Sequence, residues 1–349
     1  MLNPSNSMTD IYSPKPDGQP NNSKKHLFIK DLKPKDVVRT SFLVKYKAMA
    51  ASKNGKPYLT LILQDKTGDI DTRVWDRAEE LNTLFQEGEV VAVSGKAHEF
   101  KNRLQLVVDQ LIRLPAEEIS LSDYLPEGPA NLDERYQELL THFEGLKNPW
   151  VRDVSLALLK DPDIAPRYKL CPAAKTIHHA FLGGLLCHSL QLINLADAIL
   201  PFYPGIDRDL LLFGAAFHDF GKIFELSYQG NFGYTDEGRL VGHITIGTVL
   251  LDRKIQQMPG FPKDVEWQLK HLILSHHGRL DYGSPKRPAT LEAQLLHHLD
   301  DMDSKINSIQ TFMQNERNES RWTAYHKAYD QYYYKPSFYL ESVPEPRSE

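Results

Sequence analysis

The chain has 349 residues, of which 41% are hydrophobic and 25% charged, as in ordinary globular proteins of two or three domains. A net charge of −5 argues against a protein that is basic throughout, and the apolar stretches at 181–187 and 210–217 are too short to span a bilayer. Two cysteines, Cys171 and Cys187, exclude a disulfide framework and a thiolate zinc cluster, so a reducing, cytoplasmic location is predicted. Residues 1–25 lack the apolar run of a secretory signal and read as a disordered leader.

Residues 26–115 alternate between apolar and polar positions, and Gly and Asn turns divide them into about five strands. The stretch 76–85, DRAEELNTLF, is typical of a short helix between the third and fourth strands. Five strands with a helix in that place predict a small OB-type barrel. The segment from Tyr58 to Trp75 resembles the nucleic-acid-binding OB domains that accompany synthetase and nuclease domains.

The barrel carries a set of candidate nucleic-acid contacts. Residues 26–115 hold fifteen Lys and Arg against twelve Asp and Glu, a local charge of +3 that suits a polyanion. The candidate stacking residues are Tyr46, Tyr58, Trp75 and Phe100, and the candidate phosphate partners are Lys45, Lys47, Lys56, Arg73, Lys101 and Arg103. Each aromatic could instead pack in the core and each lysine could be solvated, and OB barrels also bind proteins and sugars.

Residues 116–131 read as a linker, and the pattern from 132 to 335 is helical. Helices are predicted near 133–146, 149–160, 179–199, 207–218, 241–257, 263–276 and 289–315, with a small hairpin near 228–234. Residues 336–349 form the tail. The tyrosine-rich stretch before it, WTAYHKAYDQYYYKPSFYL, has three interpretations: a last helix, a subunit contact or a wall of the substrate site.

Polar residues occupy five positions of this helical pattern that would otherwise be apolar, and we call these positions the polar stations. Ten of the fourteen histidines fall between 178 and 298, and the stations are His188, His218-Asp219, His243, His276-His277 and Asp300. One such histidine is usually a satisfied core residue, but five stations favour a metal centre, because imidazole and carboxylate suit Mn²⁺, Fe²⁺, Zn²⁺, Co²⁺ or Mg²⁺. Adjacent helical residues point about 100° apart, so Asp219 can bridge to a second ion.

These motifs resemble a known superfamily. The pattern His188…His218-Asp219…Asp300, with HDFGK, is similar to the HD metal-dependent phosphohydrolases, and GHITIG and SHHG resemble the two-metal branch that includes the HD-GYP phosphodiesterases. The GYP segment is absent here. An OB barrel followed by KTIHHAFLGGLLCHS, GHITIG and SHHGRLDYGSP resembles the YhaM-type 3′→5′ exoribonucleases over residues 27–315.

The resemblance implies roles for particular residues. His188, His218, Asp219 and Asp300 would hold one ion, and His243 and His276 would hold a second, bridged by Asp219. Asp300 takes the last position in preference to Asp301 and Asp303, which are expected to be solvated or to support the ligands. Lys222 would place positive charge on the scissile phosphate. Weaker candidates for metal or substrate are His277, His178, His179, Arg279 and Lys175.

The leading hypothesis is a two-metal exonuclease that shortens single-stranded RNA, or alternatively DNA, from the 3′ end. The barrel would hold the strand, and Mn²⁺ is the favoured ion. One alternative is a hydrolase of small nucleotides, such as a cyclic dinucleotide or a (d)NTP. Another is a nucleic-acid-binding protein with a vestigial HD site. The sequence leaves the oligomeric state open, a homo-oligomer included.

Overall fold

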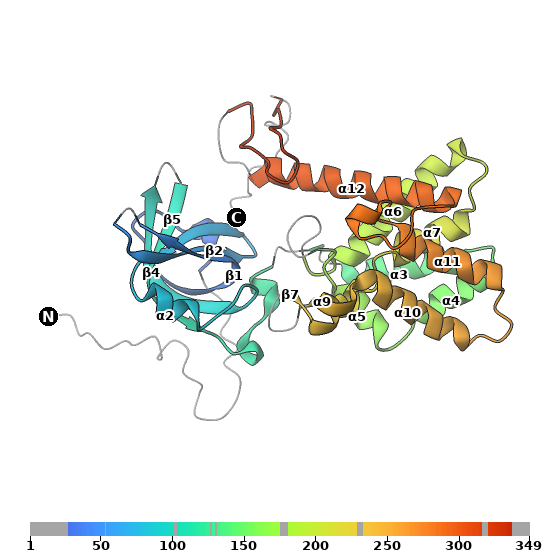
Figure 1. Ribbon diagram of the computed structural model, residues 1–349, viewed down its shortest axis with the longest axis horizontal. Coiled ribbons are helices and arrows are strands. Elements are labelled where there is room, and N and C mark those ends of the chain that lie inside the picture. The colour runs from blue at the N-terminus through green and yellow to red at the C-terminus, as the bar shows by residue number, and fades with distance from the viewer. Residues whose placement is uncertain are drawn as a thin grey trace.

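The computed structural model describes residues 27–52, 54–100, 103–125, 128–129, 131–174, 181–228, 233–315 and 320–336. A β-barrel forms one end of the molecule and a helical domain forms the other (Figure 1). The leader 1–25 and residues 337–349 of the tail lie outside the described residues, as do Lys101, Lys175, His178 and His179. Their predicted roles stay predictions.

The predicted five-stranded barrel is confirmed. Its strands are β1 (Val37–Ala51), β2 (Pro57–Asp65), β3 (Gly68–Val74), β4 (Val90–Phe100) and β5 (Arg103–Arg113), closed in the order β1-β2-β3-β5-β4. Every pair is antiparallel except β3 with β5, which is parallel. Alternate residues Leu59, Leu61 and Leu63 of β2 are fully buried, because successive side chains of a strand point to opposite faces. Helix α2 (Ala78–Asn82) is shorter than the predicted 76–85.

The segment that follows the barrel packs against it. The predicted linker contains two 3-10 turns, η2 (Ala116–Glu118) and η3 (Leu121–Asp123). The Tyr124 hydroxyl lies 2.7 Å from Ser41 Oγ, and Gln64 Nε2 donates to the Tyr124 carbonyl at 3.1 Å. Leu43 of the barrel and Leu125 of this segment belong to the same buried apolar cluster as the helical domain. The linker therefore joins the two parts through shared core.

The helical domain confirms the seven predicted helices and adds short ones. Its elements are α3 (Leu132–Glu144), α4 (Pro149–Leu159), α5 (Ile164–Leu170), α6 (Gly184–Ile199), α7 (Arg208–Phe217), α8 (Lys222–Glu225), α9 (Asp236–Val241), α10 (His243–Gln256), α11 (Lys263–Ser275) and α12 (Leu291–Asn315). The predicted helix 241–257 begins instead at His243, because Gly242 adopts a φ of +77°, which ends α9 and separates it from α10. The predicted hairpin is the two-residue pair β6 (Leu226–Ser227) and β7 (Gly233–Tyr234).

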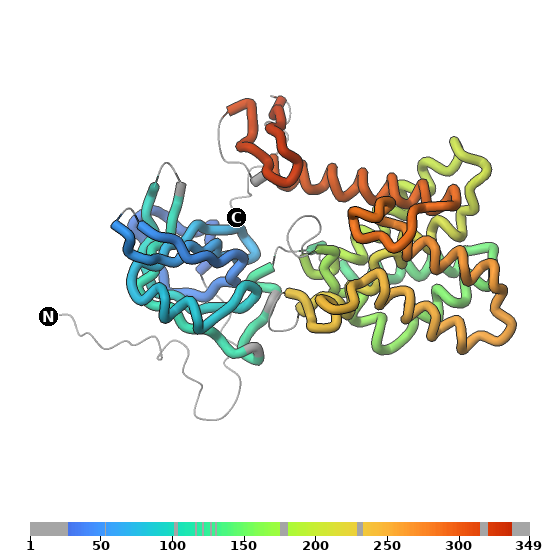
Figure 2. The backbone as a smooth tube through the Cα atoms, viewed as in Figure 1, coloured from blue at the N-terminus to red at the C-terminus, as the bar shows by residue number. Residues whose placement is uncertain are grey.

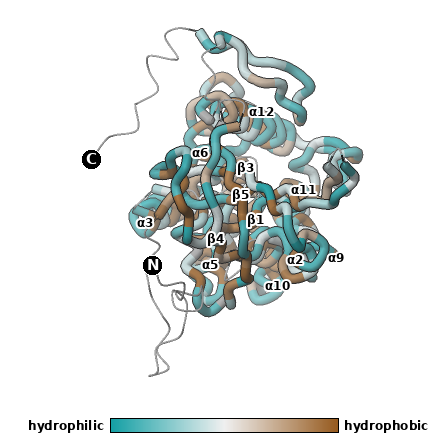
Figure 3. Tube along the Cα trace, turned by 90° about the vertical axis from the view of Figure 1, so that its left-hand side faces the viewer, coloured by the Kyte–Doolittle hydropathy of each residue, from teal (hydrophilic) through white to brown (hydrophobic). Residues whose placement is uncertain are grey.

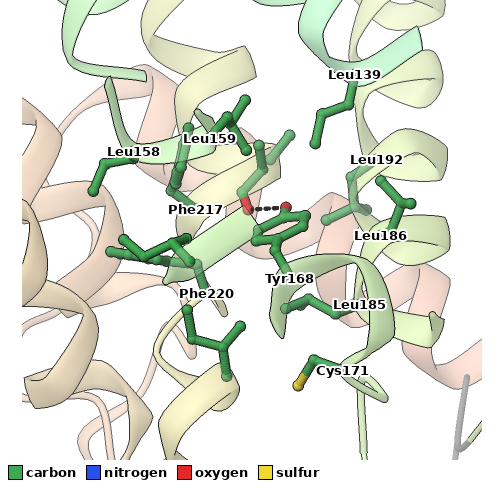
Figure 4. Close-up of a cluster of buried hydrophobic side chains, with 14 of the residues drawn as sticks. Leu139, Leu158, Leu159, Tyr168, Cys171, Leu185, Leu186, Leu192, Phe217 and Phe220 are labelled. Atoms are coloured by element: carbon green, nitrogen blue, oxygen red, sulfur yellow. Dashed lines mark hydrogen bonds between the residues drawn. The ribbon is translucent and has the colours of Figure 1, made fainter. Parts of the chain in front are cut away.

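Helix α7 is the centre of this domain, with every residue from Asp209 to Phe217 buried. Phe217 and Phe220 pack among leucines from α3, α4 and α6 (Figure 4). Tyr168 of α5 bonds both Ser189 Oγ at 2.7 Å and the Ala216 carbonyl at 2.6 Å, which ties α6 to α7. Apolar stretches, brown in Figure 3, run through both the barrel and the helices. This packing fixes the position in which α7 ends, where the polar stations begin.

Helix α6 continues through the 3-10 turn η4 (Leu200–Phe202). By length and composition alone, the continuous helical segment Gly184–Phe202 could cross a membrane. The apolar stretches recognised in the sequence, at 181–187 and 210–217, are shorter. Half of that window is buried within the protein, and the helix packs on α7, α3 and α12. Core helices of soluble proteins pass the same test. Because His188 on this helix faces the domain interior, we assign α6 to the core.

The tyrosine-rich segment does not form a last helix, so that interpretation is wrong for residues 320–336. These residues fold back on themselves through the isolated bridges Trp322↔Tyr334 and His326↔Gln331. The Thr323 N–H donates to the Tyr333 carbonyl at 2.9 Å. We call residues 320–336 the aromatic hairpin. It stands at the end of α12 that points toward the barrel (Figure 2).

Candidate metal centre

The centre begins where α7 ends. His218 caps the helix, Asp219 follows it, and Gly221 caps the next helix, α8. A Cβ at Gly221 would lie 2.0 Å from the His243 carbonyl oxygen and 2.7 Å from the Gly247 nitrogen. Only a residue without a side chain allows the two backbones to come so close. The glycine of HDFGK therefore brings His243 beside Asp219.

One group of ligand atoms comes from α6, α7 and α12. The Nε2 atom of His188 lies 3.3 Å from Nε2 of His218 and 3.2 Å from Oδ1 of Asp300. Asp219 Oδ2 is 3.3 Å from His218 Nε2. His188 and His218 are fully buried, and their ligand atoms with that of Asp300 all lie within 4.8 Å of one another. The predicted ligands of the first ion are thus brought together.

A second group faces the other oxygen of Asp219. His243, His276 and His277 place one ligand atom each within 4.8 Å of one another. Asp219 Oδ1 lies 3.4 Å from Nε2 of His243 and 3.6 Å from Nε2 of His276. His277 therefore joins His243 and His276 more closely than the sequence indicated. Asp219 contacts both groups, one oxygen to each.

Five histidines turn the same ring atom toward the centre. In each, Nδ1 lies within hydrogen-bond distance of an oxygen: Asp303 Oδ2 for His188 (2.9 Å), the Gly214 carbonyl for His218 (3.1 Å), Glu225 Oε1 for His243 (3.0 Å), the Ile273 carbonyl for His276 (2.7 Å) and the Tyr282 carbonyl for His277 (2.8 Å). A carbonyl or carboxylate can only accept, so Nδ1 carries the proton. The Nε2 atom is left to point inward, as in metal-ligating histidines.

Sequence reasoning missed one of these supporting carboxylates. Glu225 is buried, and its Oε1 accepts from both the Nδ1 and the backbone N–H of His243. The signal was present: Glu225 is the one charged residue in the apolar run IFELSY. Asp303 fulfils the supporting role expected of it, buried against His188, whereas Asp301 is partly exposed and pairs with Lys305 at 2.7 Å.

Two buried nitrogens test whether a cation fits. The Nε2 atoms of His243 and His276 are buried and have no hydrogen-bond partner. Buried polar atoms are almost always satisfied, so an orphaned pair facing one carboxylate needs an explanation. A divalent cation bound by imidazole nitrogen and carboxylate oxygen satisfies both nitrogens. The donor set therefore fits divalent metal.

The ionisation of these groups follows from burial and their neighbours. Burial favours a neutral Asp219, but the charges of Lys222 and His218 outweigh it and hold the Asp219 pKa well below its usual range. Burial lowers the pKa of His276 to about 4, so this ring is neutral at physiological pH. Burial alone would also lower the pKa of His188, but its bonds to Asp300 and Asp303 raise it to about 9.

A pocket of about 260 Å³ opens over the centre. Its lining is almost entirely polar: Asp219, Lys222, His276, His277, Tyr282, His297, Asp300, Asp301 and Ser304. Lys222 Nζ donates to Asp219 Oδ2 at 2.6 Å and to the Ala173 carbonyl at 2.7 Å. Arg279, the weaker phosphate candidate, lies over the Tyr282 ring with its guanidinium carbon 5.6 Å from the centroid.

The barrel brings four of the predicted contacts to one face. In the strand register, Tyr46 is paired with Ile62 and Arg73 with Thr60. Ile62, Thr60 and Tyr58 alternate with the buried leucines of β2, so Tyr46 and Arg73 lie with them on the outer side of the barrel. Trp75 stacks on Tyr58 with ring centroids 4.5 Å apart. Phe100 is exposed at the end of β4.

The predicted lysine contacts are engaged elsewhere. Lys45 pairs with Asp69 at 2.6 Å and Lys56 with Asp76 at 2.8 Å. Lys47 Nζ donates to the carbonyls of Asn82 and Phe85. Arg103 starts β5, and its side chain is outside the described part of the structure. Arg73 is a predicted cation that shares a face with the aromatics.

Comparison with known proteins gives two domain matches and several full-length relatives. Residues 37–114 match the OB-fold nucleic acid binding domain and residues 185–305 match the HD domain. The chain is similar to the 3′-5′ exoribonuclease YhaM of Bacillus velezensis, at 35% identity over 85% of this chain and 94% of the relative. The YhaM protein of Bacillus subtilis strain 168 is 34% identical over the same shares. Among solved structures, the second OB-fold domain of Methanococcus maripaludis replication protein A matches 27% of this chain and 97% of its own, at 24% identity and a TM-score of 0.22.

Proposed function

The chain belongs to the YhaM family of 3′-5′ exoribonucleases, and from this premise we propose that it shortens single-stranded RNA from the 3′ end at the centre around Asp219. The observation that carries the proposal is the shared carboxylate: Asp219 presents one oxygen to each of two groups of histidines. A phosphodiester is an anion, so its hydrolysis needs both an activated water and neutralisation of charge. Two adjacent ligand groups with one bridging carboxylate supply the frame for both.

We assign His188, His218 and Asp300 to one ion and His243, His276 and His277 to the other, with Asp219 between them. Two divalent cations so held would supply Lewis-acid activation of water and charge neutralisation of the phosphate. Mixed imidazole and carboxylate ligands fit Mn²⁺, which we take as the favoured ion. The free thiols of Cys171 and Cys187 agree with a reducing, cytoplasmic location.

Lys222 is the residue that we assign to the substrate. Its ammonium lines the pocket beside Asp219, and its pKa is raised because Asp219 outweighs the effect of burial. It is therefore cationic across the working pH range and can face a phosphate oxygen without binding metal. On the barrel, Tyr46, Tyr58 and Trp75 offer ring faces and Arg73 a charge to the strand.

The test of this function uses metal-stripped protein resupplied with Mn²⁺ or Mg²⁺ and a 5′-labelled single-stranded RNA of about two dozen nucleotides. A ladder of products that shortens from the 3′ end supports the proposal. RNA that stays intact with Mn²⁺ and also with Mg²⁺ would refute the proposal, and so would a single internal cut. A DNA strand of the same sequence, run in parallel, measures the preference for the 2′-hydroxyl.

Glu225→Gln is expected to weaken one ion and leave the other in place. The amide oxygen can still accept from His243, but the negative charge that strengthens the ring as a metal ligand is lost. Loss of such a supporting partner typically costs about 10–100-fold in metal affinity. Isothermal titration with Mn²⁺ should therefore show one weakened site of two. Glu292→Gln is the matched control, because Glu292 is equally buried but accepts from the Asp207 N–H at 2.9 Å, outside the pocket. Equal Mn²⁺ isotherms for the two variants would contradict the assignment.

Metal binding at His188 is expected to release a proton. With a pKa of about 9, this ring carries two protons at pH 7.5, and one must leave before Nε2 can bind a cation. His276, with a pKa of about 4, releases none. The heat of Mn²⁺ binding at pH 7.5 should therefore depend on the ionisation enthalpy of the buffer, and that dependence should fade above pH 9.

The raised pKa of His188 also predicts how the stability of the metal-free protein depends on pH. Because the folded pKa of His188 is raised, its contribution is fully present below the unfolded value of about 6.5 and is lost as pH rises through about 9. A binding heat that is the same in all buffers at pH 7.5 would show that His188 is already neutral, contrary to this account.

A further inference from the structure

The aromatic hairpin exposes four large rings that the fold does not need. Trp322, Tyr325, Tyr332 and Tyr334 are 53%, 43%, 57% and 45% exposed. No Leu, Ile, Val or Met occurs between 320 and 336, so these rings do not form the rim of an aliphatic core. Exposed aromatic side chains gathered in one short segment indicate a contact surface.

A different set of residues holds the hairpin in place. His326 packs edge-on against Phe312 of α12 with ring centroids 4.4 Å apart, and Tyr329 stacks on His326 at 4.8 Å. Thr323 is buried, and its hydroxyl accepts from the Tyr333 N–H at 3.0 Å. These contacts fix the side that faces α12. The exposed rings are therefore available for binding without loss of the fold.

The exposed rings are arranged as two edge-to-face pairs. Trp322 meets Tyr334 with centroids 5.3 Å apart at 63°, and Tyr325 meets Tyr332 at 5.2 Å and 62°. In each pair one ring holds the other at a steep angle, so its faces stay open to a third planar group. Nucleobases stack on such faces whatever their identity, because every base has a π-face.

Charge and position both favour a polyanion as the partner. Segment 320–336 carries three Lys and Arg against one Asp, in a chain whose net charge is −5, and Arg321 and Lys327 are exposed. The Asp330 carboxylate accepts a hydrogen bond from the Tyr325 hydroxyl. The one acidic group of the hairpin is thus occupied.

Helix α12 connects this surface to the candidate metal centre. Its first half supplies Asp300 and Asp303, and the hairpin follows its last turn on the side toward the barrel (Figure 1). Lys305 lies on α12 between them, and its Nζ donates to Asp301 Oδ2, on the pocket wall, at 2.7 Å. A strand that passes from the barrel to the pocket has the hairpin within reach.

We propose that the aromatic hairpin is a second binding surface for single-stranded RNA, on which bases stack against Trp322 and Tyr332 upstream of the 3′ end held at the centre. The proposal rests on the proposed function for the identity of the strand. A second copy of this chain is the competing occupant. It is less favoured because the hairpin lacks the aliphatic residues that a self-associating core would bury and carries an excess of positive charge.

The test compares Trp322→Ala/Tyr332→Ala with the matched variant Trp267→Ala/Tyr203→Ala. Trp267 and Tyr203 are as exposed, at 65% and 51%, but lie on α11 and after η4. Affinity for a 5′-labelled RNA of about two dozen nucleotides is measured in EDTA, where no cleavage occurs. Loss of two stacking rings should weaken binding about tenfold or more, with the control variant near wild type.

Two further readouts separate this proposal from the function on which it rests. Hydrolysis of bis(p-nitrophenyl) phosphate with Mn²⁺ should be unchanged in the hairpin variant, because that small diester reaches the centre without touching the hairpin. Binding within twofold of wild type would overturn the proposal even if the RNA is degraded normally. If light scattering gives the hairpin variant a molar mass different from that of wild type, the hairpin mediates self-association. That result would also overturn the proposal. Failure of wild type to cut RNA would refute the proposed function, while the affinity comparison would still decide the hairpin.

Discussion

Asp219→Asn is expected to abolish RNA degradation, with a loss of roughly a thousandfold or more in kcat/KM, as for groups that act directly on the reacting phosphate. The substitution keeps the shape of the side chain but removes the charge that faces both histidine groups. Neither group would then keep a full ligand set, because Oδ1 and Oδ2 each serve one of them. The number of Mn²⁺ ions bound per chain, measured by elemental mass spectrometry, should fall because both ions are lost together. For Glu225→Gln, only one ion is expected to bind more weakly.

Asp209→Asn is the matched control for this experiment. Asp209 is also a buried carboxylate of the helical domain, and its Oδ2 accepts from the backbone N–H groups of Lys147 and Asn148 at 2.7 and 2.6 Å. It lies outside the pocket, so its variant should retain Mn²⁺ and cleavage wherever it is folded. Comparable activity in the Asp219 variant, or loss of only one ion, would show that Asp219 does not bridge.

Gly221→Ala is expected to have the largest effect on folding. The new Cβ would lie 2.0 Å from the His243 carbonyl oxygen, and neither backbone can move without displacing α10. Overpacking of this kind costs about 3 kcal/mol or more where no flexible side chain can yield. For a domain of this size that corresponds to a melting temperature lower by roughly 6–12 °C, measured by calorimetry.

Gly233→Ala provides the comparison, because a Cβ there meets nothing within 4 Å and the backbone does not adopt a positive φ. Its melting temperature should stay close to that of wild type. Since α10 also carries His243, the Gly221 variant should bind the second ion weakly even where it remains folded. A melting temperature for Gly221→Ala equal to that of Gly233→Ala would show that α10 does not pack against this glycine as described.

The barrel and the residues of the candidate metal centre could be predicted from sequence because burial leaves a strong pattern. Alternate residues such as Leu59 and Leu61 point into the barrel, and period-two alternation reveals this directly. His188 and His218 stand out for the opposite reason, as polar residues at positions that must be buried. A buried imidazole needs a partner, so several such residues predict that they meet.

Other features depend on contacts that the sequence pattern does not encode. Helix α8 has four residues, and nothing in its pattern showed that Glu225 would meet the His243 ring. The parallel pairing of β3 with β5 is non-local, since the two strands are separated by α2 and β4. The aromatic hairpin has no aliphatic period, so the sequence left a last helix open as one interpretation, whereas the observed hairpin packs on Phe312.

The lysines show a further limit of reasoning from composition. Lys45 and Lys56 looked free to meet phosphate, but each has a carboxylate partner, Asp69 on β3 and Asp76 just after it. Lys222 was expected to place positive charge on the scissile phosphate, and the structure also joins it to Asp219 and the Ala173 carbonyl. Charge counts do not reveal such pairs, because the partners are distant in sequence or hidden in a turn.

The central claim is that Asp219 bridges two ions, and anomalous diffraction from crystals grown with Mn²⁺ tests it most directly. The account predicts two peaks about 3.5–4 Å apart, as in other two-metal sites. One should lie beside His188, His218 and Asp300, the other beside His243, His276 and His277, with the Asp219 carboxylate between them. A single peak, or two peaks that do not share Asp219, would contradict it.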